Sequence, residues 1–190
     1  MDAIEALLNR RSCRKFTSQP VEKEKLMKIL ECANFAPSPA NKQPWEFIVT
    51  TNPKYNMELQ KRVETTKGKI AEKSGWKWLP TFRVDFITEA PVLIVVTGDP
   101  DRNGAEQFLD EPSQGYEHGC CAAIENILLA AHSLGLATLW LSLFEKRDAR
   151  DIFGIDEKRD PVAIICLGYA EGPITAPARK DLSTKVKFLD

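Results

Sequence analysis

The sequence predicts one domain built from both α-helices and β-strands. Apolar residues recur at helical spacing in several long segments, whereas shorter runs rich in β-branched residues are flanked by proline or glycine. With 190 residues, of which 43% are hydrophobic, the chain is long enough to bury a core. Because no repeat or linker divides it, we expect residues 1–190 to form a single domain.

The first expected helix begins with a capping pattern. Asp2 is a suitable N-cap, Glu5 stands at the matching third position, and the apolar residues that follow keep helical spacing to about Asn9 or Arg10. A second helix is expected over residues 21–34, where four apolar side chains fall on one face.

A loop with several prolines, Pro37–Pro44, separates this second helix from an expected strand, Trp45–Thr51. The charged residues 54–75 predict one or two exposed helices. The aromatic-rich residues 76–86 have two interpretations, ordinary core packing or a mobile lid over a substrate.

Pro91–Thr97 is apolar on both faces, which predicts a central strand covered on both sides. A polar loop, 98–113, leads to the strongest helical pattern of the chain, Gly119–Gly135. This helix is apolar almost all round, so we expect burial against its own sheet and against a partner subunit.

Two further strands are expected, at Thr138–Leu143 and Pro161–Tyr169, with a short helix between them that ends near Gly154. The remaining residues, 171–190, contain few apolar side chains. Such a tail frays unless it docks on another surface.

Composition excludes several classes of function. A net charge of −1 gives no overall attraction to nucleic acid or to an anionic membrane, so we expect neither as a partner. No apolar run is long enough to span a bilayer, and the N-terminus lacks the features of a signal peptide. We therefore expect a soluble, cytoplasmic protein.

A metal site is not expected either. The five cysteines have no C-x-x-C spacing, and only two histidines could join them. The common nucleotide-binding and hydrolase motifs are also missing, so we expect a cofactor, rather than catalytic side chains, to carry any chemistry.

A short basic segment offers the donors for such a cofactor. Arg10, Arg11, Ser12 and Arg14 can converge on one phosphate, which arginine binds with bidentate, charge-assisted hydrogen bonds. The same residues also suit the negative end of the first helix or a nucleic-acid contact, so this pattern alone does not decide between these interpretations.

Four motifs, taken in order, resemble the nitroreductase family of FMN enzymes. Arg10–Phe16 is similar to its R-R-S-x-R-x-F segment, and Ala36–Trp45 to its A-P-S-x-x-N-x-Q-P-W segment. Ala130–Leu136 resembles its A-A-x-x-L-G-L segment, and Leu167–Tyr169 followed by Arg179 resembles its L-G-Y…R ending.

This resemblance implies an α+β fold with a mostly antiparallel central sheet flanked by helices. It also implies an intertwined homodimer with exchanged C-terminal tails and FMN at the interface. Arg10, Arg11, Ser12 and Arg179 would hold the phosphate, and Arg14 would approach the pyrimidine edge of the flavin. Other FMN contacts would come from Pro37, Ser38, Asn41 and Gln43 of the other subunit and from Leu139, Trp140, Leu141 and Ser142.

The implied reaction is ping-pong hydride transfer from NADH or NADPH to a small planar acceptor, such as a nitroaromatic or a quinone. No protein side chain would be catalytic, and no metal would take part. The same fold with another reductive substrate, such as an enone or a halogenated aromatic, is one alternative. A flavin-binding module without turnover is another, and the sequence does not separate them.

Overall fold

The computed structural model describes residues 2–189 and has an α+β architecture. Its sheet has the strand order β1-β2-β4-β3, and every neighbouring pair is antiparallel, which confirms the predicted sheet type. Within residues 2–189 the strands are β1 (Trp45–Thr50), β2 (Val92–Gly98), β3 (Ala137–Leu141) and β4 (Asp160–Gly168).

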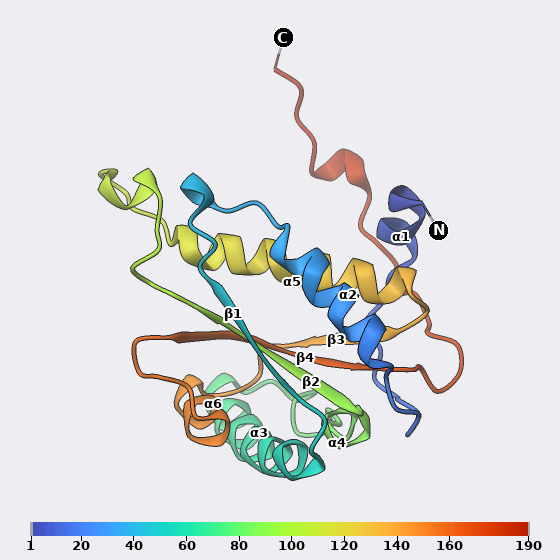
Figure 1. Cartoon of the computed structure of the whole chain (residues 1–190). Coiled ribbons are helices and arrows are strands. Elements are labelled where there is room, and N and C mark those ends of the chain that lie inside the picture. The colour runs from blue at the N-terminus through green and yellow to red at the C-terminus, as the bar shows by residue number, and fades with distance from the viewer. Residues whose placement is uncertain (1, 190) are drawn as a thin grey trace.

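Helices cover both faces of the sheet (Figure 1). Two long helices, α2 and α5, lie over one face, and α3, α4 and α6 lie over the other. The helices of residues 2–189 are α1 (Ala3–Asn9), α2 (Lys23–Asn34), α3 (Pro53–Ser74), α4 (Phe86–Glu89), α5 (Gly115–Ser133) and α6 (Lys146–Phe153).

Strand β2 is central, as its unbroken apolar run predicts. All of its residues are buried, and it pairs with β1 on one side and β4 on the other. The register places Ile94 opposite Val49 of β1 and Ile165 of β4, so β-branched side chains pack across the middle of the sheet.

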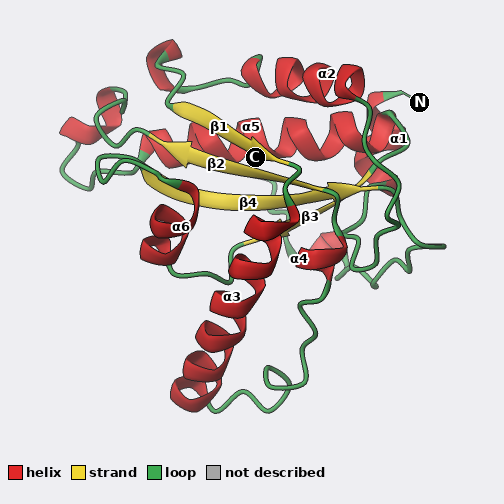
Figure 2. Ribbon diagram, turned by 60° about the horizontal axis from the view of Figure 1, so that its bottom comes forward, coloured by secondary structure: helices red, strands yellow, loops and turns green. Residues whose placement is uncertain are grey.

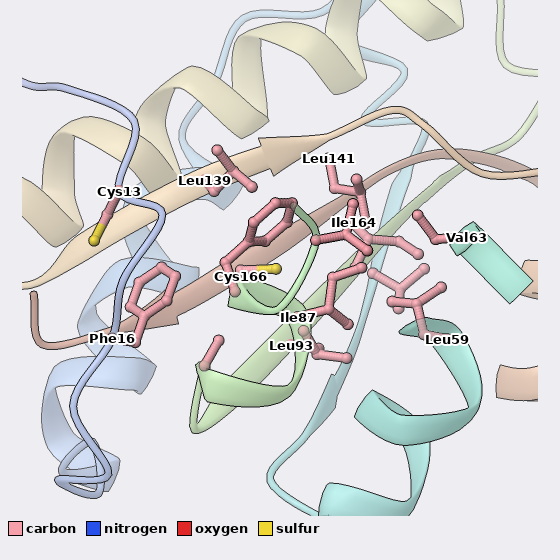
Figure 3. Close-up of a cluster of buried hydrophobic side chains, with 14 of the residues drawn as sticks. Cys13, Phe16, Leu59, Val63, Ile87, Leu93, Leu139, Leu141, Ile164 and Cys166 are labelled. Carbon is pink, nitrogen blue, oxygen red and sulfur yellow. The ribbon is translucent and has the colours of Figure 1, made fainter. Parts of the chain in front are cut away.

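Each face of the sheet has its own hydrophobic core. Under α2 and α5 the core contains Ile29, Ile94 and Ile124. On the opposite face, Leu59 of α3 packs with residues of β2, β3 and β4 (Figure 3). Phe16 from the N-terminal segment closes one end of this second core, beside Cys166.

Helix α5 is longer at its N-terminus than predicted, and its burial has two sources within the chain. One face packs on the sheet, and the second lies against α2, where the side-chain amide of Asn126 donates a hydrogen bond of 3.0 Å to the carbonyl oxygen of Cys32. The additional burial by a partner subunit stays a prediction.

Residues 53–74 form one continuous helix, α3, which projects away from the sheet (Figure 2). Asn52 caps its N-terminus, and Gly75 ends it in the left-handed conformation that suits glycine. The chain then returns toward α4 through the aromatic-rich residues 76–85. The short helix α4 was not predicted, because four residues are too few to show helical periodicity.

The C-terminal tail leaves the body of the molecule (Figure 1). Its residues from 171 to 189 are exposed, and they include large apolar side chains such as Leu182 and Phe188, the latter 86% exposed. Within the described residues, the far part of the tail therefore leaves its large apolar side chains uncovered.

Candidate functional site

The basic segment after α1 runs along the open edge of the sheet. Ser12 forms a parallel β-bridge with Thr138 of β3, and the backbone N–H of Cys13 donates to the carbonyl oxygen of Thr138 at 2.8 Å. This pairing fixes the arginines on either side of Ser12 relative to β3. The Cys13 side chain points into the core, and burial raises the pKa of its thiol, so it serves packing rather than nucleophilic chemistry.

A cavity of about 360 Å³ opens beside this segment. Arg10 and Arg11 line it from one side and His132, in the last turn of α5, from another. The Nε atoms of both arginines and the Nε2 atom of His132 are buried, yet none has a hydrogen-bond partner among the described residues. Since buried polar atoms in native proteins are nearly always paired, these three atoms mark a site for a polar ligand.

The charge of this cavity suits a phosphate. It lies at the C-terminal ends of both α1 and α5, which carry partial negative charge, so the attraction for an anion must come from the arginines. An Nη atom of Arg11 donates to the carbonyl oxygens of Leu8 at 2.6 Å and Arg10 at 2.8 Å, and thereby offsets the end of α1. Arg11 thus supports the helix end while its Nε stays free for a ligand.

Arg10 also has an acidic neighbour. Its Nε atom lies 3.7 Å from a carboxylate oxygen of Glu125 on α5, an ion pair without a hydrogen bond. The Arg10 side chain is 20% exposed and that of Glu125 is 43% exposed. The carboxylate holds the guanidinium against α5 but competes with any phosphate that binds to it.

The second group of predicted contacts forms a tight loop. The hydroxyl of Ser38 accepts the backbone N–H of Gln43 at 2.9 Å, and the side-chain amide of Gln43 donates to Asn41. Ala40, Asn41 and Gln43 all have positive φ angles, between 45° and 53°. Residues other than glycine adopt this backbone conformation at an energetic cost, and such strained residues are common at functional sites.

The structure does not bring the two groups together within one chain. The loop lies at the N-terminal end of α5, where Gly119 leaves room for Ser38, whereas the basic segment lies at the C-terminal end, beside His132. These two positions on α5 are about 20 Å apart at the rise of an α-helix. No residue of the 37–43 loop lines the cavity beside Arg10.

Strand β3 offers its backbone rather than its side chains. Leu139 and Leu141 point into the core under α3, and Trp140 packs partly on the opposite face. Because the carbonyl of Thr138 faces the open edge of the sheet, the N–H and carbonyl of Trp140, two residues further on, face the same edge. Ser142 follows directly after the strand and is exposed.

The remaining predicted contacts lie outside the Arg10 cavity. Arg14 is exposed and lines a neighbouring cavity with residues 78–89. Pro37 is exposed in its loop, and Arg179 is exposed in the tail, where it does not line the Arg10 cavity. Tail residues nearer the body, including Gly172 and Ile174, do line that cavity.

His132 is the residue that sequence reasoning missed. It stands at a variable position of the Ala130–Leu136 motif, so the motif gives it no role. His132 lies three residues before Gly135, and therefore in the last turn of α5. A polar residue at the end of an otherwise apolar helix is the sequence signal that could have indicated the cavity, which both residues line.

Comparison with known proteins decides the family. The Nitroreductase family model matches residues 7–169. The chain belongs to the nitroreductase family. It is 33% identical over 186 residues to a putative NADH dehydrogenase/NAD(P)H nitroreductase of Methanothermobacter thermautotrophicus, covering 96% of this chain and 83% of that protein. This membership confirms the sequence-based identification of an oxidoreductase of nitroreductase type.

Two further relatives bear on cofactor and substrate. A Bacteroides fragilis nitroreductase crystallised with bound FMN is 25% identical, with a TM-score of 0.76 and full coverage of both chains. An iodotyrosine deiodinase of Haliscomenobacter hydrossis is 28% identical, over 91% of this chain and 82% of that protein. Within residues 2–189, none of the helices has both the length and the apolar character needed to cross a membrane.

Proposed function

We propose that this protein is an FMN-dependent oxidoreductase that uses NADH or NADPH to reduce small planar acceptors. The observation that carries the proposal is the set of three buried nitrogen atoms of Arg10, Arg11 and His132 that lack hydrogen-bond partners among the described residues, around one cavity. In a chain of the nitroreductase family, this cavity has the size and charge for the phosphate of FMN.

When bound, FMN supplies hydride transfer from the nicotinamide donor to the acceptor. The protein's residues position it and set its electrostatic surroundings. Arg10 and Arg11, which line the cavity, would hold the phosphate together with Ser12, which follows them in sequence but does not line the cavity, and the exposed cation of Arg14 would favour negative charge near the ring. The outward-facing backbone of Trp140 offers a donor along the edge of β3.

In this proposal, the active form of the protein is a homodimer. The loop containing Ser38, Asn41 and Gln43 cannot reach the Arg10 cavity of its own chain, so a second copy supplies it. The surface supports this pairing, because Leu7 of α1 and Phe35 of α2 line an apolar groove of about 470 Å³ beside α5, and Phe35 is 80% exposed. The exchanged tail would cover part of this surface with its exposed apolar residues.

The test is a two-step spectroscopic measurement on the purified protein. Anaerobic addition of NADH or NADPH is expected to bleach the flavin absorbance, and menadione is then expected to restore it. Protein that carries FMN but is not bleached by either donor would be a flavin-binding module without turnover. Protein that neither contains nor takes up FMN would overturn the proposal.

Reductive dehalogenation is a second candidate, because this chain is 28% identical to an iodotyrosine deiodinase over most of both chains. Release of iodide from 3-iodotyrosine, measured with a chemical reductant such as dithionite, tests this candidate. Reduction of menadione by NAD(P)H without iodide release would favour the first candidate.

A further inference from the structure

A second cavity, of about 410 Å³, opens between the basic segment and the aromatic-rich return from α3. Trp78, Phe82 and Phe86 form its apolar wall, and Arg14 and Lys15 line it from the N-terminal segment. Arg14 therefore connects this cavity to the phosphate-binding segment, which begins four residues earlier along the chain.

The aromatic wall is fixed in place but left open. Trp78 stacks on Trp76 with ring centroids 5.7 Å apart and meets Phe82 edge to face at 5.7 Å. Lys67 of α3 donates to the carbonyl oxygen of Phe82 at 3.0 Å, which ties this segment to the helix. Trp78 nevertheless remains 55% exposed. A rigid indole held out of the core is a ready surface for another flat ring.

The charges around this wall leave a positive excess. The carboxylate of Asp85 is engaged by Arg83 at 2.7 Å, and that of Glu89 accepts the backbone N–H of Phe16 at 3.3 Å. Neither Arg14 nor Lys15 forms an ion pair with any described carboxylate. The cavity thus combines an aromatic face with an excess of one positive charge, since Arg14, Lys15 and Arg83 line it together with Asp85 and Glu89.

We propose that this cavity selects aromatic carboxylates as electron acceptors. The ring of the acceptor packs against Trp78, and its carboxylate is attracted by Lys15 and Arg14. The inference rests on the proposed oxidoreductase function and narrows its substrate class. For a nitro acceptor the balanced step consumes one NAD(P)H and one proton, reduces the nitro group to nitroso, and releases one water.

The test compares 4-nitrobenzoate with 4-nitrobenzamide, which has nearly the same shape without the charge. We expect the holoenzyme to prefer the carboxylate by about fivefold in kcat/KM, as one partly exposed ion pair allows. Lys15→Gln is expected to remove most of this preference. Lys77→Gln is the matched control, because Lys77 is exposed beside Trp78 but does not line the cavity.

A binding measurement separates this inference from the redox function. Benzoate, which is not reduced, is titrated calorimetrically into the FMN-loaded protein, with benzamide as the neutral comparison. Wild-type protein is expected to bind benzoate about fivefold more tightly, and Trp78→Ala to weaken both ligands by a similar factor. Equal affinity for the two ligands, or a preference unchanged in Lys15→Gln, would overturn the inference even if menadione is reduced normally. Failure of menadione reduction with an intact preference for benzoate would overturn the proposed function, and the cavity would then be a binding site for aromatic carboxylates that are not electron acceptors.

Discussion

The Arg10 cavity makes a quantitative prediction about cofactor affinity. Arg10→Ala removes a guanidinium whose Nε is buried and has no hydrogen-bond partner among residues 2–189. A hydrogen bond to a charged group contributes about 1.5–3 kcal/mol, so the dissociation constant for FMN is expected to rise about 10- to 150-fold. Titration of FMN into apoprotein, followed by quenching of flavin fluorescence, measures this change.

Glu125→Gln is the matched comparison, because it removes the ion-pair partner of Arg10 but keeps the guanidinium. The carboxylate lies 3.7 Å from the Arg10 Nε and is 43% exposed, so its competition with a phosphate amounts to at most about 1 kcal/mol. We expect FMN to bind up to about fivefold more tightly in this variant. Thermal unfolding and circular dichroism confirm that both variants fold.

Two results would refute this reasoning. If Arg10→Ala binds FMN within a factor of about two of wild type, its Nε does not face the phosphate. If Glu125→Gln weakens FMN binding as strongly as Arg10→Ala does, the pair acts by holding α1 against α5, and the phosphate assignment is wrong.

Three further predictions concern stability and dynamics. Ala40→Gly relieves a φ of 47° and is expected to raise the free energy of unfolding by about 0.5–1 kcal/mol, whereas Ala71→Gly inside α3 lowers it by about 1 kcal/mol; urea unfolding compares the two. Burial raises the pKa of the Cys120 thiol from 9.0 to about 12, so the neutral thiol is favoured by the fold and stability is lost as pH rises above 9. Cys120 contributes up to about 1.4 kcal/mol of this loss per pH unit. The loss is expected to be shallower by that amount in Cys120→Ala but not absent, because burial also raises the pKa values of the Cys121 and Cys166 thiols. Urea unfolding between pH 8 and 10 measures both slopes, and equal slopes in the two proteins would contradict the prediction. Lys67→Met removes the hydrogen bond to the aromatic segment, and faster amide exchange in residues 76–82 than in wild type is expected by hydrogen-exchange mass spectrometry.

The elements that could be predicted from sequence are those with long, regular patterns. The unbroken apolar run of β2 identified the central strand, and Asp2 caps α1 through its predicted hydrogen bond to the N–H of Glu5 at 2.9 Å. Short or irregular features escaped prediction, because α4 has no periodicity and the positive φ of Ala40 has no signature in residue type.

In the candidate site, too, the features that follow from local sequence were predictable and those that depend on tertiary contacts were not. The motifs placed Arg10 and Arg11 at one cavity because neighbours in sequence stay neighbours in space. His132 joins them only because the last turn of α5 ends beside α1, which is a tertiary contact. Likewise, no local pattern shows that Ser38 lies at the far end of α5 from Arg10.

The central claim is that one FMN site takes its two halves from two chains. The most direct measurement combines an Arg10→Ala chain with a Ser38→Ala/Asn41→Ala chain, each carrying a different affinity tag, and purifies the mixed dimer. Each altered chain alone is expected to retain little FMN. A two-fold dimer has two equivalent sites, each of which would combine Arg10 of one chain with Ser38 and Asn41 of the other. The mixed dimer should therefore contain one site that carries all three substitutions and one site that carries none. We expect about one FMN per two chains, half the wild-type content, which NADH or NADPH bleaches. A mixed dimer with no more FMN than its parents would contradict it, because each site would then be built within a single chain.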